Sequence, residues 1–248
     1  MYQHDCYLKI AVLILAGLLP QLALAYECCD WKSGKMAFQL GAAFNYAGES
    51  KHIGINGLIG DYFSVHSHTD TTIIAGLGYY LNGPALSWAD TKFGLNAFYI
   101  PSTNVSGIVT QEGVYNNLSF EYNVTSLPIL FDAKAEIHTD NAYFTPTIDI
   151  GIGPNVLSTS GFSEGSLDHG VTLPDNIFKS NTEITLGASL GAGVKFNKVN
   201  LGAKSTLECG YRFYYLGNGS LAKANGQVQN SLDTGNVYSN TLLCTLSV

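Results

Sequence analysis

Eight charged side chains recur at alternating positions within otherwise apolar or small-residue segments. They are Asp132, Lys134, Glu136, Asp149, Glu183, Lys195, Glu208 and Arg212. In an extended chain, alternate residues point to one face, so these charges would gather on a common side. Such a set can form either a buried network of ion pairs or the lining of a narrow ion path. Since buried charges are retained only when paired and hydrogen-bonded, we expect the structural network.

Arg212 is the only arginine of the chain, and Glu208 precedes it by four residues on the same face. A guanidinium group can bind carboxylates through two parallel hydrogen bonds. We therefore predict that Arg212 is the centre of the network.

His66 and His68 form the weaker candidate site. Their spacing places both imidazoles on one side of an extended segment near Asp70, where they could bind Zn²⁺ or Cu²⁺. The sequence places no third ligand, so the simpler interpretation is a solvated loop. We predict no cofactor.

The five cysteines match no metal-binding template. Cys6 lies in a segment that we expect to be removed, and Cys28 and Cys29 are adjacent near the mature start. Cys209 and Cys244 fall on the apolar phase of their segments, as small hydrophobic side chains do. A disulfide among the mature cysteines is the alternative in an oxidising compartment, and the sequence leaves the redox state open.

The elements that would position the charges are amphipathic strands. In Thr182–Phe196 the apolar phase runs through alternate residues from Ile184 to Phe196, and the other phase holds Gly, Ser, Thr and charges. After the polar turn Asn197–Asn200, Leu207–Leu216 repeats the pattern. Strands with one apolar and one small or polar face, longer than the usual five or six residues, are typical of transmembrane β-hairpins.

The same alternation marks the rest of the chain, and about eight strands result. The other segments are Met36–Tyr46, Ile73–Leu81, Phe93–Tyr99, Leu118–Ile137, Ala142–Val156 and Leu242–Val248. In Leu118–Ile137 the apolar phase shifts between Val124 and Leu127, and we predict a β-bulge there. Trp88 is expected in a turn as an interface anchor.

Long and short connections alternate, as in bacterial barrels with short periplasmic turns and long outer loops. The expected long loops are Ala47–Asp70, Pro101–Asn116, Ser158–Asn181 and Gly217–Asn236, although Val105–Val109 has the composition to extend a strand. The fold class is therefore all-β, a closed antiparallel up-and-down barrel. Both termini are expected in the periplasm and the loops outside the cell.

Composition supports a membrane barrel. Only 12% of the 248 residues are charged, against about 25% in soluble domains. A soluble lipocalin-like barrel, the competing all-β fold, would need a better solvated exterior. No interior run is long enough for a membrane helix, and the net charge of −7 argues against a nucleic-acid partner.

Residues 1–25 have the features of a secretory signal peptide. Lys9 precedes the apolar run Ile10–Leu19, and Ala23-Leu24-Ala25 is an A-x-A cleavage site. The barrel is then residues 26–248. Export followed by amphipathic strands predicts insertion in the outer membrane of a Gram-negative bacterium.

Two stretches resemble a known family. Tyr122–Glu136 is similar to the fourth strand of small opacity-type and OmpA-type barrels. Gly210-Tyr-Arg-Phe213, Leu216–Leu221 and Asn236–Val248 resemble the last hairpin of opacity-like outer-membrane proteins of intracellular gammaproteobacteria. The resemblance implies an eight-stranded, surface-exposed barrel and no reaction. The family commonly ends in an aromatic residue, whereas this chain ends in Val248.

These observations predict a non-enzymatic protein with outer-membrane lipid around it and host-surface or envelope components at its loops. One alternative is a narrow passive channel. Another is a barrel enzyme that modifies lipid A, which needs a base within hydrogen-bond reach of a nucleophile. His138 lies in a predicted periplasmic turn, on the wrong side for that chemistry.

Overall fold

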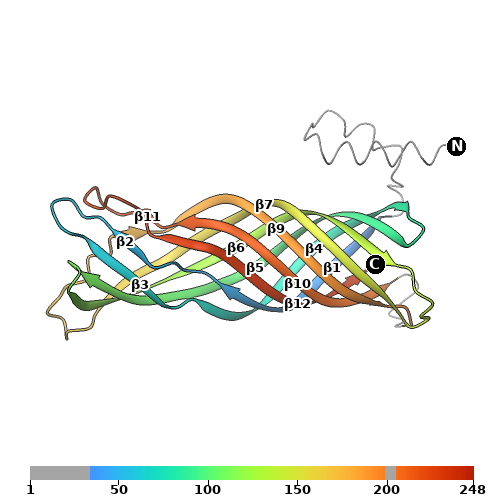
Figure 1. Ribbon diagram of the computed structural model, residues 1–248, viewed down its shortest axis with the longest axis horizontal. Coiled ribbons are helices and arrows are strands. Elements are labelled where there is room, and N and C mark those ends of the chain that lie inside the picture. The colour runs from blue at the N-terminus through green and yellow to red at the C-terminus, as the bar shows by residue number, and fades with distance from the viewer. Residues whose placement is uncertain (1–33, 199–204) are drawn as a thin grey trace, which may run out of the picture.

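A computed structural model describes residues 34–198 and 205–248. Eight antiparallel strands form a closed ring in the order β5-β4-β1-β12-β10-β9-β7-β6, and β6 pairs with β5 to close it (Figure 1). Within these residues no helix is long and apolar enough to cross a membrane. The strands are β1 (Lys35–Tyr46), β2 (Lys51–Ile53), β3 (Asp61–Ser67), β4 (Thr69–Ala85), β5 (Ala89–Gln111), β6 (Tyr115–Ile137), β7 (Phe144–Ser166), β8 (Phe178–Lys179), β9 (Asn181–Phe196), β10 (Thr206–Ser220), β11 (Ala222–Lys223) and β12 (Asp233–Ser247).

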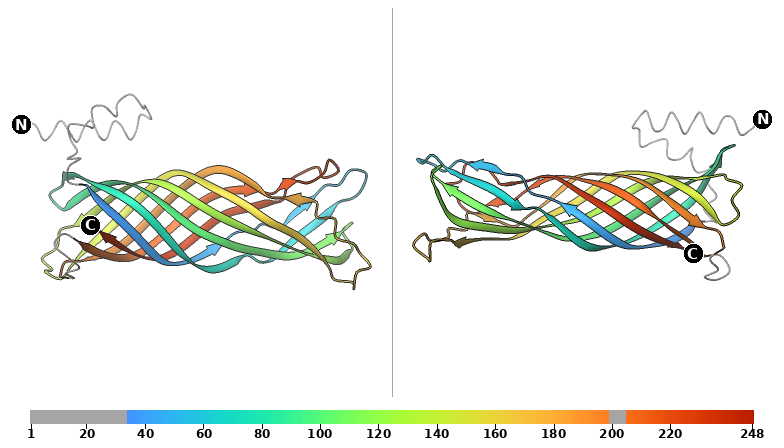
Figure 2. Two further views of the ribbon diagram at one scale, coloured as in Figure 1. Left: turned by 180° about the vertical axis from the view of Figure 1, so that it is seen from behind. Right: turned by 60° about the horizontal axis from the view of Figure 1, so that its bottom comes forward.

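The two ends of the ring differ, as Figure 2 shows from two further sides. At the turn end lie the start of β1, the end of β12 and the short connections after β4 and β6. At the loop end β5, β6 and β7 extend as strands of 23 residues each. β2 and β3 extend the sheet beside β5 at this end.

The predicted strands are present, but they are longer than the alternation suggested, and the predicted loops are correspondingly too long. Ala47–Asp70 contains β2 and β3 as well as the start of β4. Pro101–Asn116 is almost all strand, in agreement with the alternative that Val105–Val109 extends it. β7 runs to Ser166, and β10 and β12 take up both ends of Gly217–Asn236.

The bulge predicted between Val124 and Leu127 is absent from β6, which pairs regularly with β7 from Asn123 to Pro128. The extra residue lies on β5, between Ile100 and Thr103. The apolar phase shifts because the surroundings change. Leu127 is 39% exposed and faces outward, whereas Val124 is 2% exposed and faces the interior of the ring.

The loop end therefore has a core of its own inside the ring. Buried aromatic and aliphatic side chains from the long strands meet others from the connecting segments, and the set includes Ile53, Phe63, Val105, Val109, Leu118, Phe120, Tyr122, Ile177, Phe178, Leu221, Val228 and Leu232. The rings of Phe63 and Phe120 pack edge-to-face with centroids 5.1 Å apart. We call this set the loop-end core.

Candidate functional site

Arg212 lies inside the ring, 4% exposed, between two buried carboxylates. Its Nη2 atom is 2.7 Å from Oδ1 of Asp149, and its Nη1 atom is 3.6 Å from Oδ2 of Asp132. The three side chains come from β10, β7 and β6. The guanidinium also lies 5.5 Å from the ring centroid of Phe98, a cation–π distance. A cation that bridges two carboxylates across the lumen ties three strands together.

Neutral side chains complete the surroundings of Asp132. It accepts hydrogen bonds from Asn96 and, at 3.5 Å, from the hydroxyl group of Tyr80. The side-chain amide of Asn96 in turn accepts a 2.8 Å hydrogen bond from Gln39. This chain of contacts extends the network from β6 across β5 to β1. The lumen at this level is filled by side chains, as the small diameter of an eight-stranded ring requires.

A second pair lies nearer the turn end. Nζ of Lys134 is 2.9 Å from Oε2 of Glu208, and Thr147 donates a 2.9 Å hydrogen bond to Oε1 of the same carboxylate. Glu208 therefore pairs with a lysine across the lumen rather than with Arg212, its neighbour on β10. The cavity lined by these residues toward the turn end is only about 10 Å³.

Closest to the turn end, Glu136 forms ion pairs with both Lys92 and Lys195. Lys92 belongs to this network although it is not among the eight charges predicted from the alternation. The predicted strand began at Phe93, whereas β5 begins at Ala89. Extending the alternation backward by one residue would have placed Lys92 on the inward phase.

Two inward glycines make room for the buried carboxylates. A methyl group at Gly151 would collide with the carboxylate of Asp132, and one at Gly191 would collide with that of Asp149. The Gly-rich phase of these strands therefore serves the packing of the charges in a narrow lumen.

Not every predicted residue joins the network. Glu183 lies toward the loop end and accepts hydrogen bonds from Asn181 at 2.8 Å and from Ser220 at 2.9 Å. His66 is exposed, and the imidazole of His68 packs edge-to-face on Tyr46 with centroids 4.6 Å apart. No group of three metal-ligating side chains occurs among the described residues. Residues 1–25 and Cys28 and Cys29 lie outside them.

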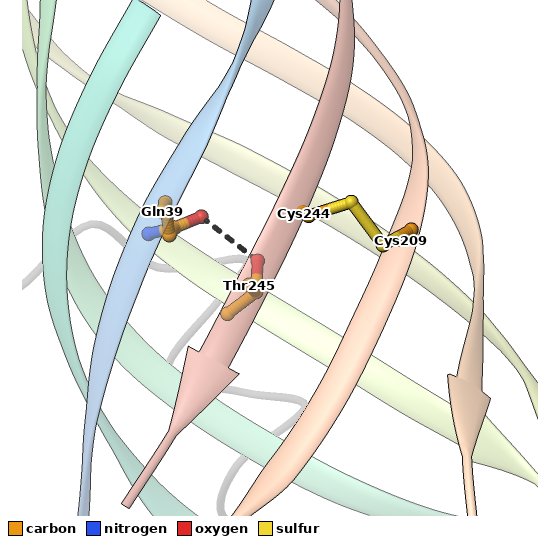
Figure 3. The surroundings of a disulfide bond; sticks show 4 residues. All are labelled: Gln39, Cys209, Cys244 and Thr245. Atoms are coloured by element: carbon orange, nitrogen blue, oxygen red, sulfur yellow. Dashed lines mark hydrogen bonds between the residues drawn. A yellow bond between two sulfur atoms is a disulfide. The ribbon is translucent and has the colours of Figure 1, made fainter. Parts of the chain in front are cut away.

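Cys209 and Cys244 form a disulfide that joins β10 to β12 on the outer face of the ring (Figure 3). The two residues are direct cross-strand partners with Cα atoms 4.1 Å apart. On the inner face, Gln39 of β1 contacts Thr245 of β12 at 3.5 Å. Of the two states that the sequence left open for this pair, the structure has the disulfide.

This disulfide predicts a specific labelling result. Under denaturing conditions, a maleimide reagent should add two more labels after reduction than before it, because both thiols are occupied in the oxidised chain. The number of labels is read by intact-mass measurement. The double variant Cys209→Ser, Cys244→Ser is the control and should lose this difference. If the unreduced chain takes up as many labels as the reduced chain, Cys209 and Cys244 are not paired.

The outer surface of the ring carries a continuous apolar belt. Its large exposed side chains come from all eight ring strands and include Phe38, Leu40, Ile73, Leu77, Leu95, Phe131, Ile150, Leu190, Tyr211 and Leu242. On β6 the outward residues are apolar from Leu127 to Ile137, the span of about nine to eleven residues that a tilted strand needs to cross a bilayer.

A closed ring leaves no unpaired strand edge in lipid, where each unpaired backbone group would cost several kcal/mol. Apolar side chains outside and paired charges inside complete the architecture of bacterial membrane barrels. The chain is a small outer-membrane β-barrel protein.

Solved structures of such barrels are similar to this one and distant in sequence. OprG from Pseudomonas aeruginosa has 15% identity and a TM-score of 0.49, over 87% of this chain and 96% of that one. Neisserial surface protein A has 14% identity and a TM-score of 0.36, over 86% and 96%. Outer membrane protein W of E. coli has 17% identity and a TM-score of 0.31, over 85% and 96%. No protein-family model and no curated protein sequence matches the chain.

At the loop end of the barrel, two carboxyl groups lie against the loop-end core. Burial raises the pKa of Glu164, although its carboxylate accepts 3.0 Å hydrogen bonds from the backbone of Asp175 and Asn176. Burial also raises the pKa of Asp61.

A carboxyl group with a raised pKa binds more protons in the folded than in the unfolded state. Glu164 and Asp61 should therefore stabilise the folded loop end while they are protonated, and this contribution is lost as the pH rises through their raised pKa values. The lowered pKa of Asp168, which accepts hydrogen bonds from Ser166 and Thr172, acts in the opposite sense, mainly at lower pH.

We expect hydrogen-exchange protection of residues 164–176, corrected for intrinsic exchange, to fall as the pH rises from about 4 to 7, the range above an ordinary carboxyl pKa. In Glu164→Gln, which keeps an acceptor oxygen and cannot ionise, this pH dependence should weaken. Asp140→Asn in the turn after β6 is the control and should leave the profile unchanged. Protection that rises with pH in the unmodified protein would show that the sign is wrong.

Proposed function

We propose that this protein is a non-enzymatic, surface-exposed barrel whose rigid loop end contacts host surfaces or other envelope components. In this proposal the loop end faces outward from the cell and both termini lie in the periplasm. The observation that carries the proposal is the closure of the loop end by a packed core. A barrel closed in this way presents a fixed surface.

Contacts between the connecting segments support a rigid surface. Ile55 forms a β-bridge with Val228, and Gly54 accepts a 2.8 Å backbone hydrogen bond from Gln229. Lys51 of β2 pairs with Asp233 of β12. β8 pairs with β11, so the segment before β9 is tied to the segment after β10. Loops held by such contacts on a scaffold are suited to recognition.

The passive channel is less well supported, because ion pairs fill the lumen at the level of Arg212 and the loop-end core fills it beyond. We expect the purified protein to give no discrete conductance steps in planar phospholipid bilayers. A general porin in the same bilayers is the positive control. Reproducible steps that respond to a substitution in the lumen, such as Lys195→Met, would favour the channel instead.

The contact function is tested by attachment of bacteria that produce the protein to cultured host cells. We expect attachment to exceed that of cells producing a variant in which residues 167–176 are replaced by a short Gly-Ser turn. Surface level and heat-modifiable gel mobility must match in the two strains. Equal attachment at equal surface level would refute a contact role for this segment.

A further inference from the structure

Seven large apolar side chains are exposed in and beside the connections of the loop end, beyond the apolar belt. They are Leu58 (61% exposed), Ile59 (70%), Val114 (72%), Tyr115 (63%), Leu167 (50%), Val171 (84%) and Leu173 (78%). They belong to three segments, namely the connection between β2 and β3, the turn between β5 and β6 together with Tyr115 at the start of β6, and the connection between β7 and β8. Figure 1 shows all three segments at the same end of the barrel. We call these seven residues the apolar rim.

The three segments are joined by hydrogen bonds. The backbone of Ile59 donates a 3.1 Å bond to Oε2 of Glu112 in the turn between β5 and β6. The backbone of Leu167 donates a 2.8 Å bond to the carbonyl of Asn117, whose side chain donates a 2.8 Å bond to Thr172. The apolar rim is thus carried by neighbouring, mutually fixed segments.

Other apolar residues close to the apolar rim in the sequence are buried in the loop-end core. Ile177 and Phe178 are 5% and 3% exposed within the loop-end core, whereas Val171 and Leu173 point into solvent. Single exposed apolar residues are ordinary, but several together on one surface mark an interaction site. The apolar rim is therefore a candidate surface for binding a partner.

The charge around the rim indicates the chemistry of that partner. Residues 47–70, 103–123, 157–183 and 217–236 together hold ten Asp or Glu, three Lys and no Arg. The rest of the chain holds nine acidic and nine basic residues, so these four ranges account for the whole net charge of −7. Glu112, Asp168 and Asp175 lie in the rim segments themselves. Complementary potentials steer and select partners at such surfaces.

We propose that the apolar rim and its carboxylates form a docking surface for a partner protein that presents apolar side chains flanked by lysine or arginine. This inference rests on the proposed function, because it requires the loop end to face outward. An anionic lipid surface would be repelled by the net charge of −7 at this end, which is why a cationic protein segment fits better.

The test uses the full-length mature protein in phosphatidylcholine nanodiscs, with empty nanodiscs subtracted. The probe is a synthetic amphipathic helix of leucine and lysine, and the second probe has glutamate in place of each lysine. We expect the lysine probe to bind, with an affinity that falls as salt is added, and the glutamate probe not to bind. Equal binding of both probes would overturn the charge requirement.

The rim variant is Val171→Ser, Leu173→Ser. It should weaken binding of the lysine probe roughly tenfold or more, as the loss of exposed apolar anchors does at interfaces. The matched control, Trp88→Ser, Tyr143→Ser, removes two exposed apolar residues at the turn end and should bind as the unmodified protein does. Equal binding by the rim variant would refute the proposal.

Three further measurements separate the alternatives. Asp175→Asn should weaken binding of the lysine probe and reduce its salt dependence, whereas Asp140→Asn should not. Capture of phosphatidylcholine vesicles through the rim, with no binding of the lysine probe, would replace the protein partner by a membrane.

If bacteria with the rim variant attach to host cells as well as the unmodified strain does, the inference fails and the contact function stands. If the unmodified protein confers no attachment, the proposed function fails.

Discussion

Replacing Arg212 by methionine is expected to lower the free energy of unfolding by about 3–5 kcal/mol, the usual cost of removing one partner of a buried ion pair. Asp132 and Asp149 are 0% and 6% exposed, so the substitution leaves two carboxylates in the lumen without their shared cation. The measurement is urea unfolding of the protein folded into phospholipid vesicles. The folded fraction is read from the mobility of unheated samples on a gel.

Two variants decide whether this loss comes from the unpaired carboxylates. Arg212→Met combined with Asp132→Asn and Asp149→Asn removes the charges together and should recover much of the stability. Lys195→Met removes one of the two cations on Glu136 and leaves Lys92 in place, so it should cost less than about 1 kcal/mol. If Arg212→Met unfolds at the same urea concentration as the unmodified protein, the ion-pair network does not stabilise the barrel.

Alternation in the sequence was enough to predict the ring and the side on which each charge lies, because the period of a strand is independent of its neighbours. It was not enough to predict which charges meet. Glu208 and Arg212 share a face of β10, yet Glu208 pairs with Lys134 from β6. Which side chain stands across the lumen depends on the stagger of all eight strands, and local spacing carries no information about it.

The same limit applies to Cys209 and Cys244. Both were placed on the apolar face, but their pairing depends on the register between β10 and β12, which sets them directly opposite each other. The extensions of β5 and β7 beyond the belt were expected to be loops for a different reason. Their apolar residues face inward, as Val105 of β5 does at 0% exposure, so the rule that apolar means lipid-facing fails above the belt.

Apolar side chains face outward in the belt and inward above it. The same substitution on the outer surface should therefore have different effects in the two parts of the barrel. Ile150 of β7 and Ile108 of β5 both point away from the interior, but Ile150 lies in the belt and Ile108 lies on the extension beyond it. Ile150→Arg should destabilise the folded barrel by about 2–4 kcal/mol, the cost of arginine on the lipid face near the bilayer midplane. Ile108→Arg should cost clearly less, about 1 kcal/mol or below, because Ile108 is partly exposed and an arginine there can extend its charged end into water.

The pair is informative because the substitution, the outward direction and the strand conformation are the same at both positions. The main difference is the surrounding medium, although Ile150 is 60% exposed on the ring whereas Ile108 is partly covered by its neighbours. Urea unfolding in vesicles gives the two free energies. Unfolding in detergent micelles, which adapt to an added charge better than a bilayer does, should shrink the difference between the variants. Equal costs in vesicles would mean that lipid reaches Ile108. The point near Val124 where the apolar side chains of β6 change from outward-facing to inward-facing would then not be the edge of the bilayer. The loop-end core would lie within the bilayer.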